Sequence, residues 1–449
     1  MIMDNLQKKS ITIIGAGLAG CFLSILLAKR GYQVTLYERT SKKNIFKKAS
    51  KRSFNLTFYG YGVQALKEAG LWKAIKPIVL TLSGSITQVG NNANPIVTKL
   101  DKEKMPYYTV SRSRLLQTLV EQALLDPAIT INFDTSLIAI NRQQKTITVK
   151  HTKTHEQSTI TADVILGTDG VNSQVRKIMQ RGQKATHTRE FANWNYKQIP
   201  LSKELAKKLS LQNKYMHAWT RKEALFTAFP NGDGSFAAML ILPKNETQGF
   251  STLTDDTTIK EFFAKHFPEL SPAVPVISKA VQRNPESHFI TMSTSHWYYK
   301  NFIAILGDAA HAFLPFYGQG ISTAFADCIS LVELIDKHGD DWGRIFPLYQ
   351  RARKRHTDVL GNLSKESFTR YTRTKKADYS AIYDRLEFMA HQLLSRIQPP
   401  LYVSVSKDPA HAADHFKKYQ RQRKFAKSIG VPLVVHAITQ LVGFQENSS

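Results

Sequence analysis

Cysteine and acidic residues are scarce in this chain of 449 residues. It has only two cysteines, Cys21 and Cys328, and both lie in apolar stretches. Neither a disulfide framework nor a thiolate metal site is therefore expected, and we predict no bound metal and a reducing, cytoplasmic location. Asp and Glu number 35 against 61 Lys and Arg, which gives a formal net charge of +26.

The excess of positive charge has three interpretations. Basic residues are concentrated in residues 42–52 and in the C-terminal third of the chain. They can form a solvated surface, or they can attract an anionic membrane, cofactor or substrate. Nucleic-acid binding is not expected, because the aromatic residues follow the core pattern and no recognition motif accompanies the charge.

Long apolar runs are also missing. Residues 8–28 imitate a secretory signal peptide, but their glycine spacing and the strand that follows fit a nucleotide-binding fold better. The apolar segment 429–444 contains His436, Thr439 and Gln440 and falls short of the ~20 residues that span a bilayer. We expect a packed terminal helix there, with peripheral membrane contact through the basic C-terminal region as the alternative.

The first of two glycine signatures lies in residues 11–20. An apolar β-branched run over 11–14 predicts a buried strand, and a helix is expected over 21–30. The first glycine suits a tight turn, the second lets the backbone approach a pyrophosphate, and the third permits close packing of helix on strand. We therefore predict a phosphate-binding loop made by Gly15, Gly17, Leu18, Ala19 and Gly20.

An acidic residue follows this loop at the spacing of a ribose-binding group. The expected second strand, 34–38, ends in Glu38, and Arg39 comes next. A carboxylate in this place accepts a hydrogen bond from a ribose 2′-hydroxyl and disfavours a 2′-phosphate. We predict that both residues contribute to nucleotide binding, and that NADP does not occupy this loop.

The second glycine signature lies in residues 307–320. Asp308 ends an expected strand over 302–306, and Gly320 opens an expected helix over 321–337 whose first amides would face a flavin. A third motif, Gly167–Gly170, contains Asp169 between a buried strand and a helix. Together the signatures predict FAD held at both ends by one fold. His311 is interpreted as a packed residue, not as a catalytic base.

These signatures, in this order, resemble the single-component FAD-dependent aromatic hydroxylases (group A flavoprotein monooxygenases), and most closely the kynurenine 3-monooxygenases. Further matches are Lys51–Leu56, Asn195–Pro200 and Pro400–Tyr402. The resemblance implies that NADPH or NADH reduces FAD, and that a flavin C4a-hydroperoxide transfers oxygen from O2 to a small aromatic substrate. In tryptophan catabolism this reaction converts L-kynurenine to 3-hydroxykynurenine.

The resemblance also implies site residues. Those expected on the reacting side of the flavin are Pro315, Phe316 and Gly318. Those expected to bind or flank FAD are Arg52, Asn55, Arg112, Asp169, Asp308, Gly320, Ile321 and Ser322. Tyr402 would bind the substrate.

Other positions depart from the resemblance. Ser85 stands where the family has a carboxylate-binding arginine, a residue near Lys99 stands for a tyrosine, and Ala377 for an asparagine. Ser322 replaces an asparagine beside the flavin. Losing the guanidinium removes the strongest carboxylate contact. A different aromatic or polycyclic substrate, or an NAD(P)H oxidase or regulator without hydroxylation, therefore remains an alternative.

The expected fold class is α/β. A Rossmann-like FAD-binding domain would comprise residues 8–75, 105–180 and 296–341. It would be interleaved with an antiparallel-sheet substrate domain over 76–104 and 181–295, followed by a helical region over 342–449. Within the substrate domain we expect strand structure over 80–87 and one helix, near 259–266.

Overall fold

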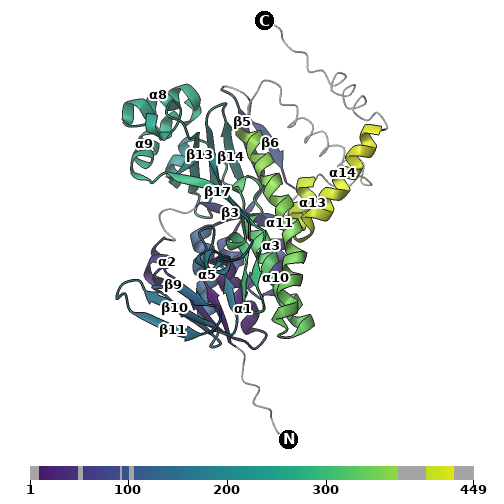
Figure 1. Cartoon of the computed structure of the whole chain (residues 1–449). Coiled ribbons are helices and arrows are strands. Elements are labelled where there is room, and N and C mark those ends of the chain that lie inside the picture. The colour runs from purple at the N-terminus through teal and green to yellow at the C-terminus, as the bar shows by residue number, and fades with distance from the viewer. Residues whose placement is uncertain (1–9, 49–53, 92–93, 101–105, 373–400, 429–449) are drawn as a thin grey trace.

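The computed structural model describes residues 10–48, 54–91, 94–100, 106–372 and 401–428. Arg52, Ala377 and the apolar segment 429–444 lie outside the described residues. Within them the strands form four sheets; in Figure 1, α8 and α9 lie at the upper left, and α10 and α11 lie at the right beside the C-terminal helices. The expected α/β class with a helical C-terminal region is confirmed.

The first sheet has six strands, five of them parallel. In spatial order they are β18 (Tyr298–Tyr299), β19 (Ile303–Ile305), β12 (Ile165–Gly167), β1 (Ser10–Ile14), β2 (Gln33–Tyr37) and β8 (Ile129–Asn132). Helix α1 (Leu18–Ala28) packs against both α5 (Arg112–Leu124) and α10 (Gly320–His338). The β-branched strand residues are buried in one core together with these helices and with apolar residues of the segment 137–149.

The largest sheet has eight strands and is mostly antiparallel. In spatial order they are β20 (His311–Ala312), β17 (Ser287–Thr294), β13 (His187–Leu201), β16 (Phe236–Pro243), β15 (Leu225–Pro230), β14 (Tyr215–Thr220), β5 (Gly84–Val89) and β6 (Ile96–Lys99). Its outer face packs with α7 (Lys203–Lys208), α8 (Asp256–His266) and α9 (Val274–Arg283) around a phenylalanine-rich core. The expectation of a single helix in this region was wrong, because α7 and α9 also cover the sheet.

Two smaller sheets complete the strands. One contains β11 (Gln157–Thr161), β10 (Thr146–His151) and β9 (Thr135–Asn141); the other contains β3 (Asn55–Tyr59), β7 (Tyr107–Ser111) and β4 (Leu80–Leu82). The alternating segment 80–87 therefore forms two strands in different sheets. Gly84 separates them: its φ of +155° suits glycine, and a β-carbon there would overlap the carbonyl oxygen of Thr98.

The remaining helices connect or cover these sheets. They are α2 (Lys42–Lys48), α3 (Tyr61–Glu68), α4 (Trp72–Ile75), α6 (Gln174–Met179), α11 (Trp342–Thr372), α13 (Leu401–Lys407) and α14 (Ala412–Ser428). Helix α11 packs on α10 and on α14, and so joins the first sheet to the C-terminal helices (Figure 1). In the described part of the chain, no helix has the length and apolar character needed to cross a membrane.

Candidate active site

Three loops meet at the carboxyl ends of neighbouring parallel strands. They follow β1, β12 and β19, which lie side by side in the sheet. A β-carbon placed on Gly15 would lie 2.8 Å from the carbonyl oxygen of Thr168, and one on Gly307 would lie 3.6 Å from the β-carbon of Ala19. Signatures far apart in the sequence therefore form one continuous surface, where open α/β sheets bind ligands.

The three glycines of the first loop differ in their surroundings. Gly15 has a φ of +101°, which glycine tolerates best. A β-carbon on Gly20 would overlap the carbonyl oxygen of Gly15, so helix and loop are in direct contact there. Around Gly17 the nearest atom to such a carbon would be the Thr168 oxygen, at 3.9 Å. Gly17 therefore leaves open space beside the first turn of α1, as a phosphate requires.

The two helices that start at the glycine signatures begin without a capping side chain. Neither α1 nor α10 has a side-chain cap or an acidic residue in its first turn. In contrast, α5, α6, α7 and α8 are capped by Ser111, Ser173, Ser202 and Asp255. Uncapped amides at a helix N-terminus are suited to an anion. A β-carbon on Gly320 would meet nothing within 4 Å, so the start of α10 is also open.

Glu38 is fixed at the end of β2. Its carboxylate accepts hydrogen bonds from the backbone N–H of Ala16 (2.9 Å) and from that of Thr40 (2.8 Å). These contacts hold the acid beside the first glycine loop, in the position expected of a ribose ligand. Arg39 is exposed next to it.

Asp169 stabilises the loop that follows β12, called the third loop below. Its carboxylate accepts from the backbone N–H groups of Gln174 (2.6 Å) and Val175 (3.2 Å) at the start of α6. Burial raises the pKa of this carboxyl, and these hydrogen bonds oppose the rise. Arg176 of α6 donates to the carbonyl oxygen of Ala309 (2.6 Å) and so ties this loop to the second glycine signature.

Asp308 lies in the second signature, in the short helix η4 (Gly307–Ala309). The residue is exposed to solvent, and the protein atoms around its carboxyl displace part of its water and so raise its pKa. The charges of His311 and Arg112 act against the rise, so Arg112 at the start of α5 lies near Asp308. An accessible carboxylate beside a cation suits the hydroxyls and phosphates of a flavin nucleotide.

A cluster of buried charged residues contacts the second glycine signature on the side of α10 and α11. It was not predicted from the sequence. Asp327 of α10 is fully buried and accepts from Gly307 N–H (3.0 Å), His311 Nε2 (2.6 Å) and Arg353 Nε (2.8 Å). Burial alone would raise the pKa of Asp327, but His311 and Arg353 bring it below its ordinary value. Arg353 also donates to the Ala410 carbonyl, near α14. An aspartate within the apolar stretch of α10 was the available signal.

The segment expected on the reacting side is the short helix η5 (Pro315–Tyr317), followed by Gly318 with φ of +66°. A β-carbon on Gly318 would lie 3.1 Å from Thr57 Oγ1. Phe316 contacts Phe289 of β17 (ring centroids 5.3 Å apart) and Phe368 of α11 (4.8 Å). Pro315, Phe316 and Gly318 therefore lie between the small sheet of β3 and the inner face of the large sheet, which is the face opposite to α7, α8 and α9.

Other residues expected around the flavin are placed as follows. Asn55 is buried at the start of β3 and donates to the Pro230 carbonyl and to Asn231, both 3.0 Å away, so it joins the small sheet to β15. Ile321 and Ser322 are buried in the first turn of α10, and Ser322 packs against Gly62 of α3. Tyr402 belongs to α13.

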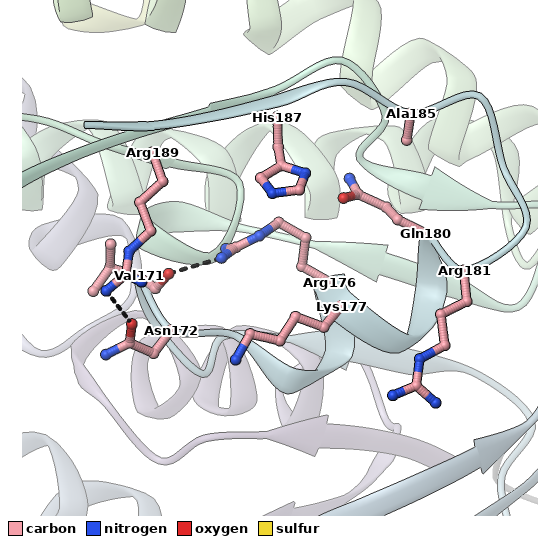
Figure 2. Close-up of a pocket in the computed structure, with 9 residues that line it drawn as sticks. All are labelled: Val171, Asn172, Arg176, Lys177, Gln180, Arg181, Ala185, His187 and Arg189. Atoms are coloured by element: carbon pink, nitrogen blue, oxygen red, sulfur yellow. Dashed lines mark hydrogen bonds between the residues drawn. The ribbon is translucent and has the colours of Figure 1, made fainter.

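A basic pocket that the sequence did not reveal adjoins the third loop (Figure 2). It has a volume of about 350 Å³ between α6 and the start of β13. Its cations are Arg176, Lys177, Arg181 and Arg189, with His187 beside them, and none of its lining residues is acidic. Arg189 donates to Asn172 (3.0 Å), and burial lowers the pKa of Arg176. The pocket is therefore suited to an anion.

Comparisons with known proteins agree with this geometry. A family model described as an FAD binding domain matches residues 8–357. "Kynurenine 3-monooxygenase" of Salinispora arenicola is 31% identical over 96% of this chain and 95% of its own length, and that of Flavobacterium johnsoniae is 32% identical over 82% and 81%.

Solved structures show the same fold. The tetrameric form of 2-methyl-3-hydroxypyridine-5-carboxylic acid oxygenase has a TM-score of 0.67 at 20% identity and covers 92% of this chain and 98% of its own. HpxO of Klebsiella pneumoniae, solved with FAD and uric acid, has a TM-score of 0.68 at 16% identity, covering 90% and 97%.

The chain is an FAD-dependent monooxygenase. Within the class it belongs to the kynurenine 3-monooxygenase family.

Proposed function

We propose that this enzyme uses NADPH or NADH and O2 to hydroxylate a small aromatic substrate. One turnover converts an aromatic C–H, O2, NAD(P)H and a proton into C–OH, NAD(P)⁺ and water. Bound FAD supplies the redox chemistry, since it accepts a hydride and, once reduced, activates O2. The observation that carries the proposal is the convergence of the three loops beside a cluster of aromatic side chains.

The protein binds the cofactor and excludes water. The uncapped first turns of α1 and α10 would bind phosphate and stabilise negative charge at the flavin edge. Arg112 and Asp308 would hold the phosphate and sugar. Pro315, Phe316 and Gly318 would cover the reacting side and keep water from it.

L-Kynurenine, giving 3-hydroxykynurenine, is the candidate substrate that the relatives' names support. In this reading the Tyr402 hydroxyl holds the substrate carboxylate, and Tyr402→Phe would raise the KM for kynurenine. A different aromatic compound is the second candidate substrate. Position 85 is a serine, so it provides no guanidinium to bind a substrate carboxylate. The register of β5 and β6 pairs Ser85 with Thr98, so Lys99 lies on the opposite face and does not replace it.

The basic pocket of Figure 2 is the candidate docking place for the phosphates of the reduced nicotinamide coenzyme. This coenzyme is a polyanion, and the described residues contain no second glycine-loop fold for it. Four cations around one cavity would attract it, and its affinity would then fall with rising salt.

The reaction can be tested with purified holoenzyme, NADPH or NADH, and ¹⁸O2. We expect aromatic substrate to accelerate flavin reduction and the product to carry one ¹⁸O atom. Reduction that responds to no aromatic compound, with all oxygen recovered as hydrogen peroxide, would identify an NAD(P)H oxidase instead.

A further inference from the structure

Two serines of helix α11 hold the segment 314–318, called the reacting segment below. Ser364 Oγ donates a hydrogen bond to the carbonyl oxygen of Leu314, and Ser367 Oγ donates to that of Phe316 at 3.0 Å. The serines are three residues apart, so they lie on one face of the helix. The two carbonyls stand on either side of a proline, and the hydroxyls therefore fix the backbone on both sides of it.

Other hydroxyl groups of α11 bond within the helix itself. Each donates to a carbonyl three or four residues earlier: Thr357, Thr369 and Thr372. Such a carbonyl is the ordinary partner of a serine or threonine inside a helix. Ser364 and Ser367 instead donate to a separate part of the chain. Their contacts therefore form a specific link between α11 and the reacting segment.

The link through Ser364 is buried. Ser364 is 1% exposed, and Leu314, whose carbonyl accepts its hydrogen bond, is 5% exposed. A carbonyl that loses its donor in such a place finds no water to replace it and retains the cost of desolvation. Ser367 is half-buried. We therefore expect the Ser364 contact to contribute more than the Ser367 contact to holding the segment.

Helix α11 is suited to hold the segment because it is itself fixed at two places. In its first half, Arg353 pairs at 2.8 Å with the buried Asp327, which also contacts the second glycine signature. Near its end, Phe368 packs on Phe289 of β17, with ring centroids 6.3 Å apart. The helix thus links the second glycine signature to the large sheet, and a segment bound to it keeps its position relative to both.

The same helix packs on the reacting segment through apolar side chains. Tyr317 is buried in a cluster with Leu360 and Leu363 of α11 and with Val405 of α13. Helix α13 also carries Tyr402, the candidate substrate ligand. The reacting segment and this candidate ligand therefore share one support.

We propose that Ser364 and Ser367 are positioning residues for the hydroxylation. The proposal rests on the hydroxylase function above. By holding two carbonyls of the reacting segment, the serines keep it over the reacting side of the site and keep water out. They act through the segment and not on the substrate. When the segment is loosened, NAD(P)H, O2 and a proton give NAD(P)⁺ and hydrogen peroxide, and the aromatic C–H is left unchanged.

Hydrogen exchange of the substrate-free holoenzyme tests the contact without any turnover. Mass spectrometry follows the amides of peptides that cover residues 311–319. Ser364→Ala should accelerate exchange in this region by about tenfold to a hundredfold, because an unsatisfied buried acceptor favours local opening. Ser367→Ala should accelerate it less.

Thr369→Ala is the matched control for this measurement. It removes a hydroxyl from the same helix, but the partner of that hydroxyl is the Lys365 carbonyl, 3.0 Å away within α11. Exchange over residues 311–319 should therefore stay at the wild-type rate. Wild-type exchange in the two serine variants, or equal acceleration in the control, would overturn the proposed link.

Coupling tests the role of the serines in the reaction. It is the amount of hydroxylated product per NAD(P)H consumed, with L-kynurenine as the first aromatic compound tested. The double variant Ser364→Ala/Ser367→Ala should lower this ratio by about tenfold, because oxygen transfer tolerates little displacement of the groups around it. The missing oxygen should be recovered as hydrogen peroxide, and the KM for NAD(P)H should not change.

A pair of variants of equal shape isolates the hydroxyl. Ser367→Thr keeps the donor and should couple as the wild type does, whereas Ser367→Val fills the same space without a donor and should release more hydrogen peroxide. Equal coupling in these two variants, or wild-type coupling in the double variant, would overturn the positioning role.

The two proposals fail in different ways. If the hydroxylase function is wrong, the wild-type enzyme itself forms no hydroxylated product from any aromatic compound. If only the positioning role is wrong, the wild type and the double variant form the product with the same coupling. The exchange measurement needs no substrate and tests the contact in either case.

Discussion

The flavin side of the site and the sheet side are built on opposite principles. On the flavin side, Glu38, Asp169 and Asp327 hold backbone amides in place, and glycines are required where backbones touch. On the sheet side, neutral and aromatic side chains form a wall with few directional contacts. On the function proposed here, fixed backbone geometry would hold the cofactor, whereas side chains that can change without altering the fold would select the substrate.

The largest effect should come from Gly17→Val. The open space at Gly17 accepts a side chain in the cofactor-free fold, but that side chain would occupy the phosphate position. We expect a folded protein that retains almost no FAD and has no activity, measured by flavin absorbance and circular dichroism.

Gly20→Ala is the comparison for this variant. A β-carbon on Gly20 would overlap the Gly15 backbone, so this change affects packing. It should lower the free energy of unfolding by about 1–3 kcal/mol, as overpacking does. The two variants separate the space that Gly17 leaves for the cofactor from the contact that Gly20 makes in packing. A Gly17→Val protein that does not fold, or a Gly20→Ala protein as stable as wild type, would contradict this distinction.

Asp327→Asn should have the next largest effect, a loss of folding stability. It leaves the buried Arg353 without its counter-ion, which should lower the free energy of unfolding by about 3–5 kcal/mol. The folded-state pKa of Asp327 lies below its ordinary value, so its stabilisation is present above that ordinary pKa and is lost as the pH falls. Urea unfolding at several pH values should show the difference from wild type shrinking below about pH 4.

Asp336→Asn is the control for this variant. Asp336 pairs with Arg30 at 2.6 Å, but its side chain is 52% exposed. Its loss should cost less than about 1 kcal/mol. Equal costs for the two variants would show that the buried cluster has no special role.

Asp308→Asn should have a smaller effect, and its effect on stability should differ from its effect on FAD binding. Asp308 is exposed, so solvent screening leaves the raised pKa of its carboxyl little effect on the stability of the cofactor-free fold. The variant should therefore unfold at nearly the wild-type temperature without FAD. It should nevertheless bind FAD more weakly, as titration of the apoprotein would show. Unchanged FAD affinity would remove Asp308 from the site.

The smallest effect should come from Arg189→Glu in the basic pocket. It should raise the KM for NAD(P)H severalfold at low salt, with less difference from wild type at high salt. Lys207→Glu, in a separate basic depression of the sheet region, is the control and should leave this KM unchanged. Equal KM changes in both variants would indicate a general effect of net charge.

The same contrast explains what the sequence could predict. The glycine spacing and Glu38 encode local geometry, so the first strands, helix and loop could be predicted closely. Asp327 and Arg353 meet only through tertiary packing, and no local pattern connects them. The sequence predicted strand structure over 80–87 but could not place the break at Gly84, because that break depends on Thr98, a distant neighbour. The residues of the basic pocket are close in the sequence, within 171–189, but they enclose a cavity only through the turn of the chain from α6 into β13, which no local pattern encodes.

A crystal structure of the enzyme with FAD tests the central claim most directly. The account predicts the phosphates at the first turn of α1 beside Gly17, a ribose at Glu38, and the flavin ring between Asp308 and the start of α10. FAD bound elsewhere, or a flavin ring that does not reach Gly318 and Gly320, would contradict it.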